Sequence, residues 1–176
     1  MNETTFWDWI DKSYQREKGD TELQADWLID NLQKATKEDL IGFHQQFLRQ
    51  LDKVYRTDFQ SICAYILKDD LSDEDEERFD YFCAWLISLG RKNFDAILQN
   101  PDAMADFLEK DQELDECVCE SETMLYIADI AYEEKTGKDD FYDLFDAEVV
   151  LMLKGSPIAA NAIPQKFPNI ARKVNA

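Results

Sequence analysis

Carboxylates are the side chains of this chain best suited to chemistry, and they gather in two stretches. The first stretch reads D-D-L-S-D-E-D-E-E and spans residues 69–77. Its seven carboxylates are Asp69, Asp70, Asp73, Glu74, Asp75, Glu76 and Glu77. They could bind a basic partner or a divalent cation, or they could form a solvated helix start that the helix dipole stabilises. Acid–base catalysis needs a buried carboxyl group with a raised pKa, and so hydrophilic a stretch does not predict burial. Of these functional roles, we predict that the stretch binds a basic partner.

The second stretch, D-Q-E-L-D-E-C-V-C-E-S-E, has the spacing of a calcium-binding loop between two predicted helices. Four carboxylates fall at EF-hand positions one, three, five and twelve, namely Asp111, Glu113, Asp115 and Glu122. Oxygens at these offsets can supply the six to eight ligands that calcium requires. Glu116, however, occupies the position of the turn glycine, and Glu113 replaces the usual Asp or Asn. Calcium binding is therefore a second hypothesis beside a simple acidic loop over 111–121.

The cysteines and the single histidine offer weaker candidates. Cys117 and Cys119 could supply two zinc ligands, but such a site needs four, and the sequence has no second pair at finger-like spacing. Cys63 and Cys83 lie in apolar helical stretches and are predicted core residues. His44 lies at the apolar edge of a predicted helix, where a partly buried histidine is expected. The chain has no recognisable nucleophilic triad spacing and no glycine-rich phosphate loop.

The charge of the chain limits its partners. The net charge of the 176 residues is −19, and the part from Lys154 onward has four basic residues and no acidic one. The acidic remainder would repel nucleic acid and anionic membranes, so a basic protein or peptide, or a cation, is the natural partner. The alternative is that acidic side chains simply keep a helical protein soluble. Because no secretory signal or membrane-length apolar run is visible, we expect a cytoplasmic protein with free thiols.

The element expected to organise the fold is the stretch from Phe79 to Gly90. Between Phe79 and Leu89 only Asp80 and Ser88 are polar, which predicts a helix buried on nearly every side. Upstream, apolar residues recur with helical period from Leu40 to Tyr55, after a Thr36 cap. Few glycines and prolines interrupt the chain.

We predict an all-α fold, a single compact domain of roughly seven to nine helices around that central helix. The acidic helical domain is expected over residues 1–153. Residues 154–176 are expected to form a basic tail or short helix packed on it. The segment 141–153 is predicted to be helical, although its V-V-L-M-L run could form a strand. The oligomeric state does not follow from the sequence.

Two motifs resemble a bacterial family known as domain of unknown function 4240. The start of the chain is similar to the family's F-W-x-x-I-D pattern, at Phe6, Trp7, Ile10 and Asp11. A second segment is similar in register to its F-x-x-F-x-x-W-L-I-x-x-G-R pattern, at Phe79, Phe82, Trp85, Leu86, Ile87, Gly90 and Arg91. The stretch around Asn100, Pro101 and Asp102 resembles the family as well, and the similarity covers residues 3 to 145.

The chain departs from that pattern at two places. The family's second pattern begins with S-D-D, and Ser72 and Asp73 lie three residues too far from Phe79 to match it. Either three residues are inserted here, or Asp75, Glu76 and Glu77 replace the family's acidic triplet. Cys83 stands where the family commonly has an arginine. The resemblance implies no activity, but some relatives resemble parts of larger regulators, which favours an interaction role.

The leading hypothesis is a non-enzymatic binding or regulatory module whose acidic surface recognises a basic protein, for example as an inhibitor of a toxin. Three alternatives stay open. The first is a calcium- or metal-responsive protein that uses the second acidic stretch. The second is an enzyme, which would need a pocket containing a buried carboxylate or His44. The third is nucleic-acid mimicry, in which the acidic surface competes with DNA for a basic protein.

Overall fold

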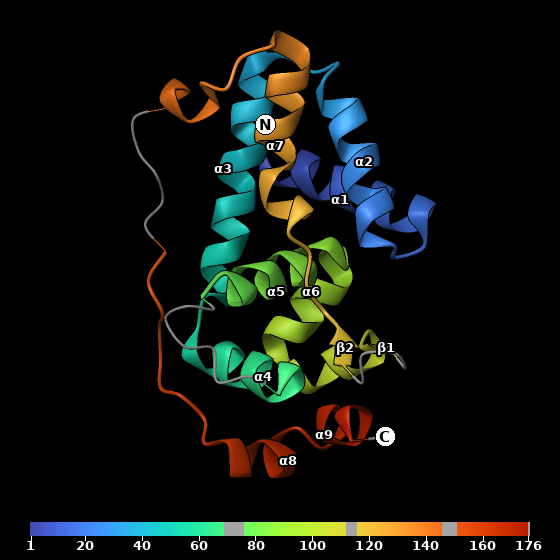
Figure 1. Cartoon of the computed structure of the whole chain (residues 1–176), viewed down its shortest axis with the longest axis vertical. Helices are drawn as coiled ribbons and strands as arrows, with labels where there is room; N and C mark the ends of the chain where they lie inside the picture. The colour runs from blue at the N-terminus through green and yellow to red at the C-terminus, as the bar shows by residue number, and fades with distance from the viewer. Residues whose placement is uncertain (69–75, 112–115, 146–150, 176) are drawn as a thin grey trace.

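The computed structural model describes residues 1–68, 76–111, 116–145 and 151–175. Among these residues there are nine α-helices, three short 3-10 helices and one two-stranded hairpin, so the predicted all-α class is confirmed (Figure 1). The α-helices are α1 Glu3–Glu17, α2 Thr21–Leu32, α3 Lys37–Val54, α4 Thr57–Leu67, α5 Glu76–Ser88, α6 Arg91–Gln99, α7 Thr123–Thr136, α8 Ile163–Lys166 and α9 Pro168–Val174. In the part of the chain that the structure describes, no helix has the length and apolarity needed to cross a membrane.

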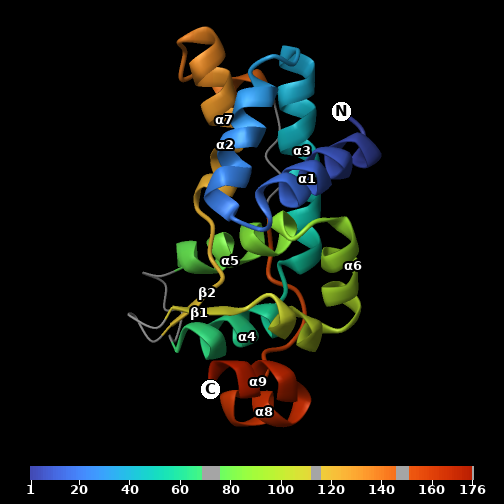
Figure 2. The same cartoon turned by 90° about the vertical axis from the view of Figure 1, so that its right-hand side faces the viewer.

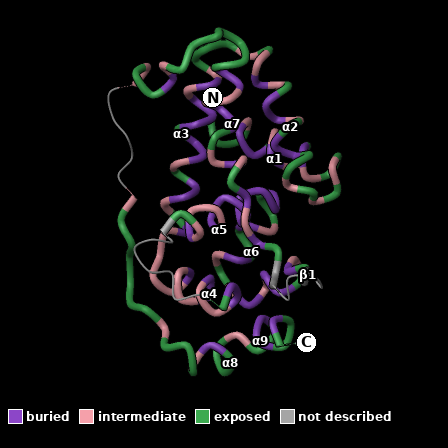
Figure 3. The backbone as a smooth tube through the Cα atoms, in the orientation of Figure 1, coloured by how far each residue is buried: buried purple, intermediate pink, exposed green. Residues whose placement is uncertain are grey.

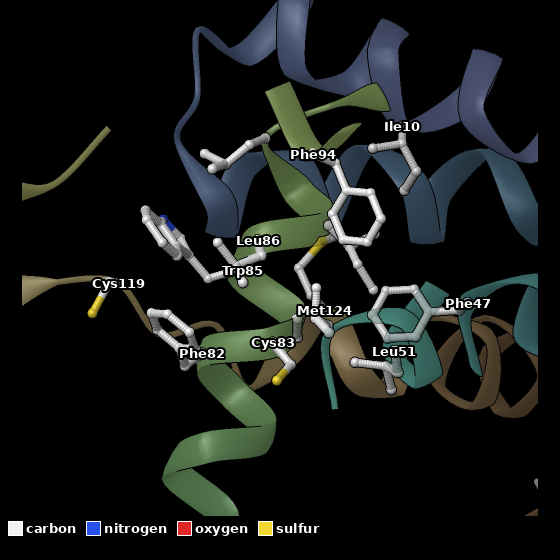
Figure 4. Packing of buried hydrophobic residues seen from close by; sticks show 14 of the residues in the cluster. Ile10, Phe47, Leu51, Phe82, Cys83, Trp85, Leu86, Phe94, Cys119 and Met124 are labelled. Carbon is white, nitrogen blue, oxygen red and sulfur yellow. The ribbon is translucent and has the colours of Figure 1, made fainter. Parts of the chain in front are cut away.

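Helix α5 is the centre of the molecule, as predicted. It lies between α1, α2, α3 and α7 on one side and α4 and the hairpin on the other (Figures 1 and 2). Every residue from Phe82 to Gly90 is buried. Cys83 points from it toward Met124 of α7 and Leu51 of α3, whereas Phe82 and Trp85 point to the other side, toward Cys119 (Figure 4). A helix with neighbours on all sides has no polar face to keep, which explains its composition.

Capping residues set the ends of several helices. The Thr36 hydroxyl accepts a hydrogen bond from the backbone N–H of Asp39 at 3.1 Å, which begins α3 as the sequence predicts. Asp20 begins α2 in the same manner, through the backbone N–H of Leu23 at 3.0 Å. After α5, Gly90 has a φ of +85°, a conformation that favours glycine.

Several residues of the two motifs have structural roles. Phe6 and Trp7 are buried in the core. Asp11 accepts a hydrogen bond at 2.8 Å from the backbone N–H of Arg91, so the first motif caps the helix that follows the second. A Cβ atom on Gly90 would lie 2.7 Å from an oxygen of Asp11, which leaves no room for a larger residue there. These residues therefore build the fold.

The region between α6 and α7 differs from the sequence expectation. A 3-10 helix, η1 (Pro101–Asp106), is followed by an antiparallel hairpin of β1 (Glu109–Asp111) and β2 (Glu116–Val118). Lys110 lies opposite Cys117 in the hairpin. The prediction of a plain acidic loop over 111–121 is wrong for Asp111 and for 116–118, because backbone pairing forms strands there although the side chains give no apolar alternation, whereas 119–121 have no regular structure.

The predicted helix over 141–153 is also absent from its described part. Only η2 (Phe141–Leu144) is helical there, and 151–153 have no regular structure. Phe141 is buried against Tyr132 and His44, and this packing against α7 and α3 takes the place of helical continuation. Lys154 then pairs with Arg56 in an isolated parallel bridge.

The carboxyl-terminal part runs along the molecule as a largely exposed segment and ends in a third short 3-10 helix, η3 (Ala160–Ala162), followed by α8 and α9 (Figure 3). Ile163 and Ile170 are fully buried. The Asp102 carboxylate accepts hydrogen bonds from the backbone N–H groups of Asn169 and Ile170, both at 3.0 Å. An acid of η1 therefore caps α9 and holds these helices on the body.

Candidate functional site

The carboxylates of the first acidic stretch lie mostly outside the described residues. Asp69, Asp70, Asp73, Glu74 and Asp75 belong to 69–75, which the structure does not describe, and of Glu76 only the backbone is described. Glu77 is exposed in the first turn of α5. The partner-binding role of the stretch therefore stays a prediction, and Glu77 shows where it joins the described surface.

Glu77 lies beside the same tyrosine, Tyr81, as Glu122 of the second acidic stretch. Tyr81 donates a hydrogen bond to the Glu77 carboxylate at 3.3 Å. Burial, and then the carboxylates of Glu122 and Glu77, raise the pKa of Tyr81 to about 12. Burial and the charges of Glu122, Glu77 and Asp80 also raise the pKa of Tyr126 on α7. Two glutamates 45 positions apart in the sequence thus flank the same pair of tyrosines.

The linker between β2 and α7 fixes this meeting point. Its Ser121 donates a backbone hydrogen bond at 3.1 Å to the carbonyl oxygen of Tyr81, and the linker passes across α5 in Figures 1 and 2. Arg78 donates to both carboxylate oxygens of Glu120, at 3.0 and 2.7 Å. This two-point pair joins the start of α5 to the linker.

Helix α7 extends the negative charge away from α5. Glu122, Tyr126, Asp129 and Glu133 recur at intervals of four, three and four residues, which places them on one helical stripe. Buried residues occupy the opposite side, including Met124, Ile127, Ala128 and Ala131. Glu122 and Glu133 are exposed, and Asp129 is half-buried. We name Glu77, Glu122, Asp129 and Glu133 the acidic face.

The acids of this face repel one another. Burial, followed by the charges of Glu133 and Asp139, raises the pKa of Asp129. The fold therefore keeps several carboxylates at distances where like charges interact, and a basic partner would relieve that repulsion.

The described residues do not gather into a metal site. Within 1–68, 76–111, 116–145 and 151–175, no three His, Cys, Asp or Glu side chains converge to hold an ion. Of the proposed calcium ligands, Glu122 belongs to the acidic face, the backbone of Asp111 lies in β1, and Glu113 and Asp115 fall outside the described residues. A strand precedes this segment in place of the expected helix. Calcium binding itself stays a prediction.

The other candidates are parts of the core. Cys63, Cys83 and Cys119 are fully buried, and burial raises the pKa of the Cys83 thiol. His44 is 8% exposed, and its ring packs 5.3 Å from that of Phe145, measured between centroids. Burial lowers the pKa of His44 to about 4, so the ring is neutral at pH 7. The prediction of a buried histidine is confirmed.

Sequence reasoning missed Tyr81, Tyr126, Asp129 and Glu133. The four-three-four spacing of acids and tyrosine on α7 is visible in the sequence and could have indicated an acidic stripe. No sequence pattern indicates that Glu77 and Glu122 lie close together, since this depends on how α7 packs against α5.

A family model described as "Protein of unknown function (DUF4240)" matches residues 1–134. The chain belongs to this family. The match confirms the resemblance, and it covers α1 to α6, the hairpin and nearly all of α7, with the whole acidic face. It ends before η2 and the carboxyl-terminal helices. The chain has no match among curated proteins or among solved structures.

Proposed function

We propose that this DUF4240 protein is a non-enzymatic binding module whose acidic face recognises a basic surface on another protein. The observation that carries the proposal is the stripe on α7, which opposes the buried side of that helix and is joined by Glu77 of α5. Carboxylates spread along a helix suit several separate ammonium or guanidinium groups better than one ion. Regulation or inhibition of the basic partner would follow from covering its surface.

A cytoplasmic location forms part of this proposal. Cys83 is a free thiol that contributes to the core. Free buried thiols are characteristic of a reducing compartment. The net charge of −19 also favours fast, steered association with a basic partner and disfavours nucleic acid.

The test compares two variants of equal net charge. The first, Glu122→Gln/Asp129→Asn/Glu133→Gln, removes three charges from the acidic face. The second, Asp8→Asn/Asp30→Asn/Glu38→Gln, removes three exposed charges from α1, α2 and α3. A lysine- and arginine-rich helical peptide serves as the probe, and its dissociation constant is measured by calorimetry at several salt concentrations.

We expect the first variant to bind about ten-fold more weakly and to lose most of the salt dependence, because exposed pairs contribute roughly 0.2–1 kcal/mol each. The second variant should bind almost as the wild type does. Equal losses in both variants would show that net charge alone attracts the peptide, and the proposal would then be wrong.

A further inference from the structure

A pocket of about 590 Å³ lies beside the acidic face. It is formed by the turn between α1 and α2, the second half of α5, η1 and the hairpin. Its aromatic and aliphatic walls come from Tyr14, Trp85, Leu89, Phe107 and Val118. Trp85 and Leu89 are 4% exposed, whereas Val118 is 53% exposed at the pocket mouth. The pocket therefore has a firm inner wall and an apolar surface left open to solvent.

The three rings give this pocket a preference for positive charge. Tyr14, Trp85 and Phe107 come from three separate elements and line the same space. The face of an aromatic ring is negative, and a cation over tyrosine, phenylalanine or especially tryptophan is attracted to it. Trp85 is held by its core contact with Phe82, at 5.8 Å between ring centroids, so the indole is fixed before a ligand arrives.

The rim of the pocket has the same preference. Asp20, Asp106 and Glu109 contribute three exposed carboxylates, against one ammonium group from Lys18. Asp20 is oriented by its cap on α2. Asp106 and Glu109 are exposed and line the pocket, so a ligand can reach their carboxylates. An anionic ligand would meet a net negative rim.

The pocket and the α5 end of the acidic face lie on the same side of α5. Glu77, Tyr81, Trp85 and Leu89 follow at intervals of four residues, and Glu77 lies roughly 12 Å along the helix axis from Trp85. The linker from Val118 to Glu122 runs between the same two places. One basic segment of ordinary length could therefore reach both.

We propose that this pocket binds an arginine side chain of the basic partner. The methylene stem would lie against Leu89 and Val118, and the planar guanidinium would stack on the rings while it pairs with rim carboxylates. Arginine suits these walls better than lysine because its guanidinium stacks and forms two-point pairs. The inference rests on the proposed function for the identity of the partner, but the pocket can be tested alone.

The test uses a short peptide that is too small to cover the α7 stripe. Acetyl-Gly-Arg-Gly-amide is titrated into the isotope-labelled full chain, and the indole N–H signal of Trp85 is followed by NMR. The matched peptide carries norleucine in place of arginine. We expect a saturable shift of the Trp85 signal with the arginine peptide, and at least ten-fold weaker binding of the norleucine peptide.

Two double variants separate this inference from the proposed function. Asp106→Asn/Glu109→Gln should weaken the arginine peptide at least three-fold, while Asp129→Asn/Glu133→Gln on α7 should leave it unchanged. A Phe107→Leu variant, with its fold checked by circular dichroism, should also bind more weakly because one ring is lost.

The absence of a saturable shift, or equal binding of the two peptides, would overturn the pocket assignment. Equal losses in both double variants would do so as well, since they would indicate unspecific attraction by charge. In each of these cases the longer basic peptide could still distinguish the acidic face from its control, so failure of the pocket and failure of the proposed function give different results.

Discussion

The core around α5 and the acidic face on α7 use polar groups in opposite ways. Among the described residues, the buried carboxylate is that of Asp102, which accepts hydrogen bonds from two backbone N–H groups of α9. On α7, partial burial and then the like charges of Glu133 and Asp139 raise the pKa of Asp129. Burial demands partners for every charge, whereas solvent screens unpaired ones. Changes in the core should therefore alter stability, and changes on the acidic face should alter binding.

The largest effect on stability is expected from a substitution in the core around α5. Phe82→Ala removes a fully buried ring that packs between Phe79 and Trp85. We expect the free energy of unfolding to fall by about 3–5 kcal/mol, because apolar contacts are lost and a cavity remains. Urea unfolding measures this change.

Met152→Ala is the matched control, since Met152 is 66% exposed. Its unfolding free energy should change by less than about 0.5 kcal/mol. Comparable losses in the two variants would contradict the placement of the core around α5.

A pH dependence is expected from His44, an ionisable group whose pKa is lowered by burial. Its pKa is about 4 in the fold, against 6.5 as the ordinary value. Between these values the unfolded chain binds more protons, so stability should be complete above pH 6.5 and fall as the pH drops toward 4. The loss from this residue should be about 2–3 kcal/mol.

The measurement is the free energy of unfolding at pH 7, 5.5 and 4.5 for the wild type and for His44→Phe. The variant keeps an aromatic ring among Phe141, Tyr142 and Phe145, so its packing stays similar. We expect its stability to depend less on pH over this window. Parallel curves for the two proteins would show that His44 is not the responsible group.

Asp102 and Asp106 provide a direct comparison of a buried and an exposed acid on the same 3-10 helix. Asp102→Ala should lower the free energy of unfolding by about 1–3 kcal/mol, because backbone donors of α9 lose their acceptor. Trypsin should then cleave faster at Lys166 and Arg172. Asp106→Ala should change neither measurement, and equal effects would remove the distinction between the two acids.

The core around α5 can be predicted from the sequence more readily than the candidate site can. The near-continuous apolar stretch of α5 predicts burial without knowledge of its neighbours, and Thr36 predicts the start of α3 from its own side chain. Local signals failed where packing or strand pairing decided the outcome. Phe141 and its neighbours carry helix-compatible residues, but their rings pack on His44. The hairpin forms although its first strand, Glu109–Asp111, consists of residues with low strand propensity.

The acidic face illustrates why functional surfaces are harder to predict. Glu77 and Glu122 each belong to a run of carboxylates that is visible in the sequence. That the two lie beside the same tyrosine depends on the path of the linker across Tyr81. Asp129 and Glu133 needed only a helical projection of α7. The pocket had no sequence signal, because Tyr14, Trp85 and Phe107 come from elements whose relative placement is set by the whole core.

The smallest stability effect, and the one with the most informative sign, is expected from Asp129→Asn. The pKa of Asp129 is raised in the fold, so its charged form destabilises the protein once the pH exceeds that pKa. The amide resembles the protonated acid and should stabilise the fold by about 0.5 kcal/mol at pH 7. This corresponds to a rise of about 1–2 °C in Tm, which should disappear at pH 3 where the wild-type carboxyl is also neutral.

The same variant should bind the basic peptide more weakly. A gain in stability together with a loss in affinity would show that the acidic face is kept at a cost to the fold, whereas a loss in both would make Asp129 a structural residue like Asp102.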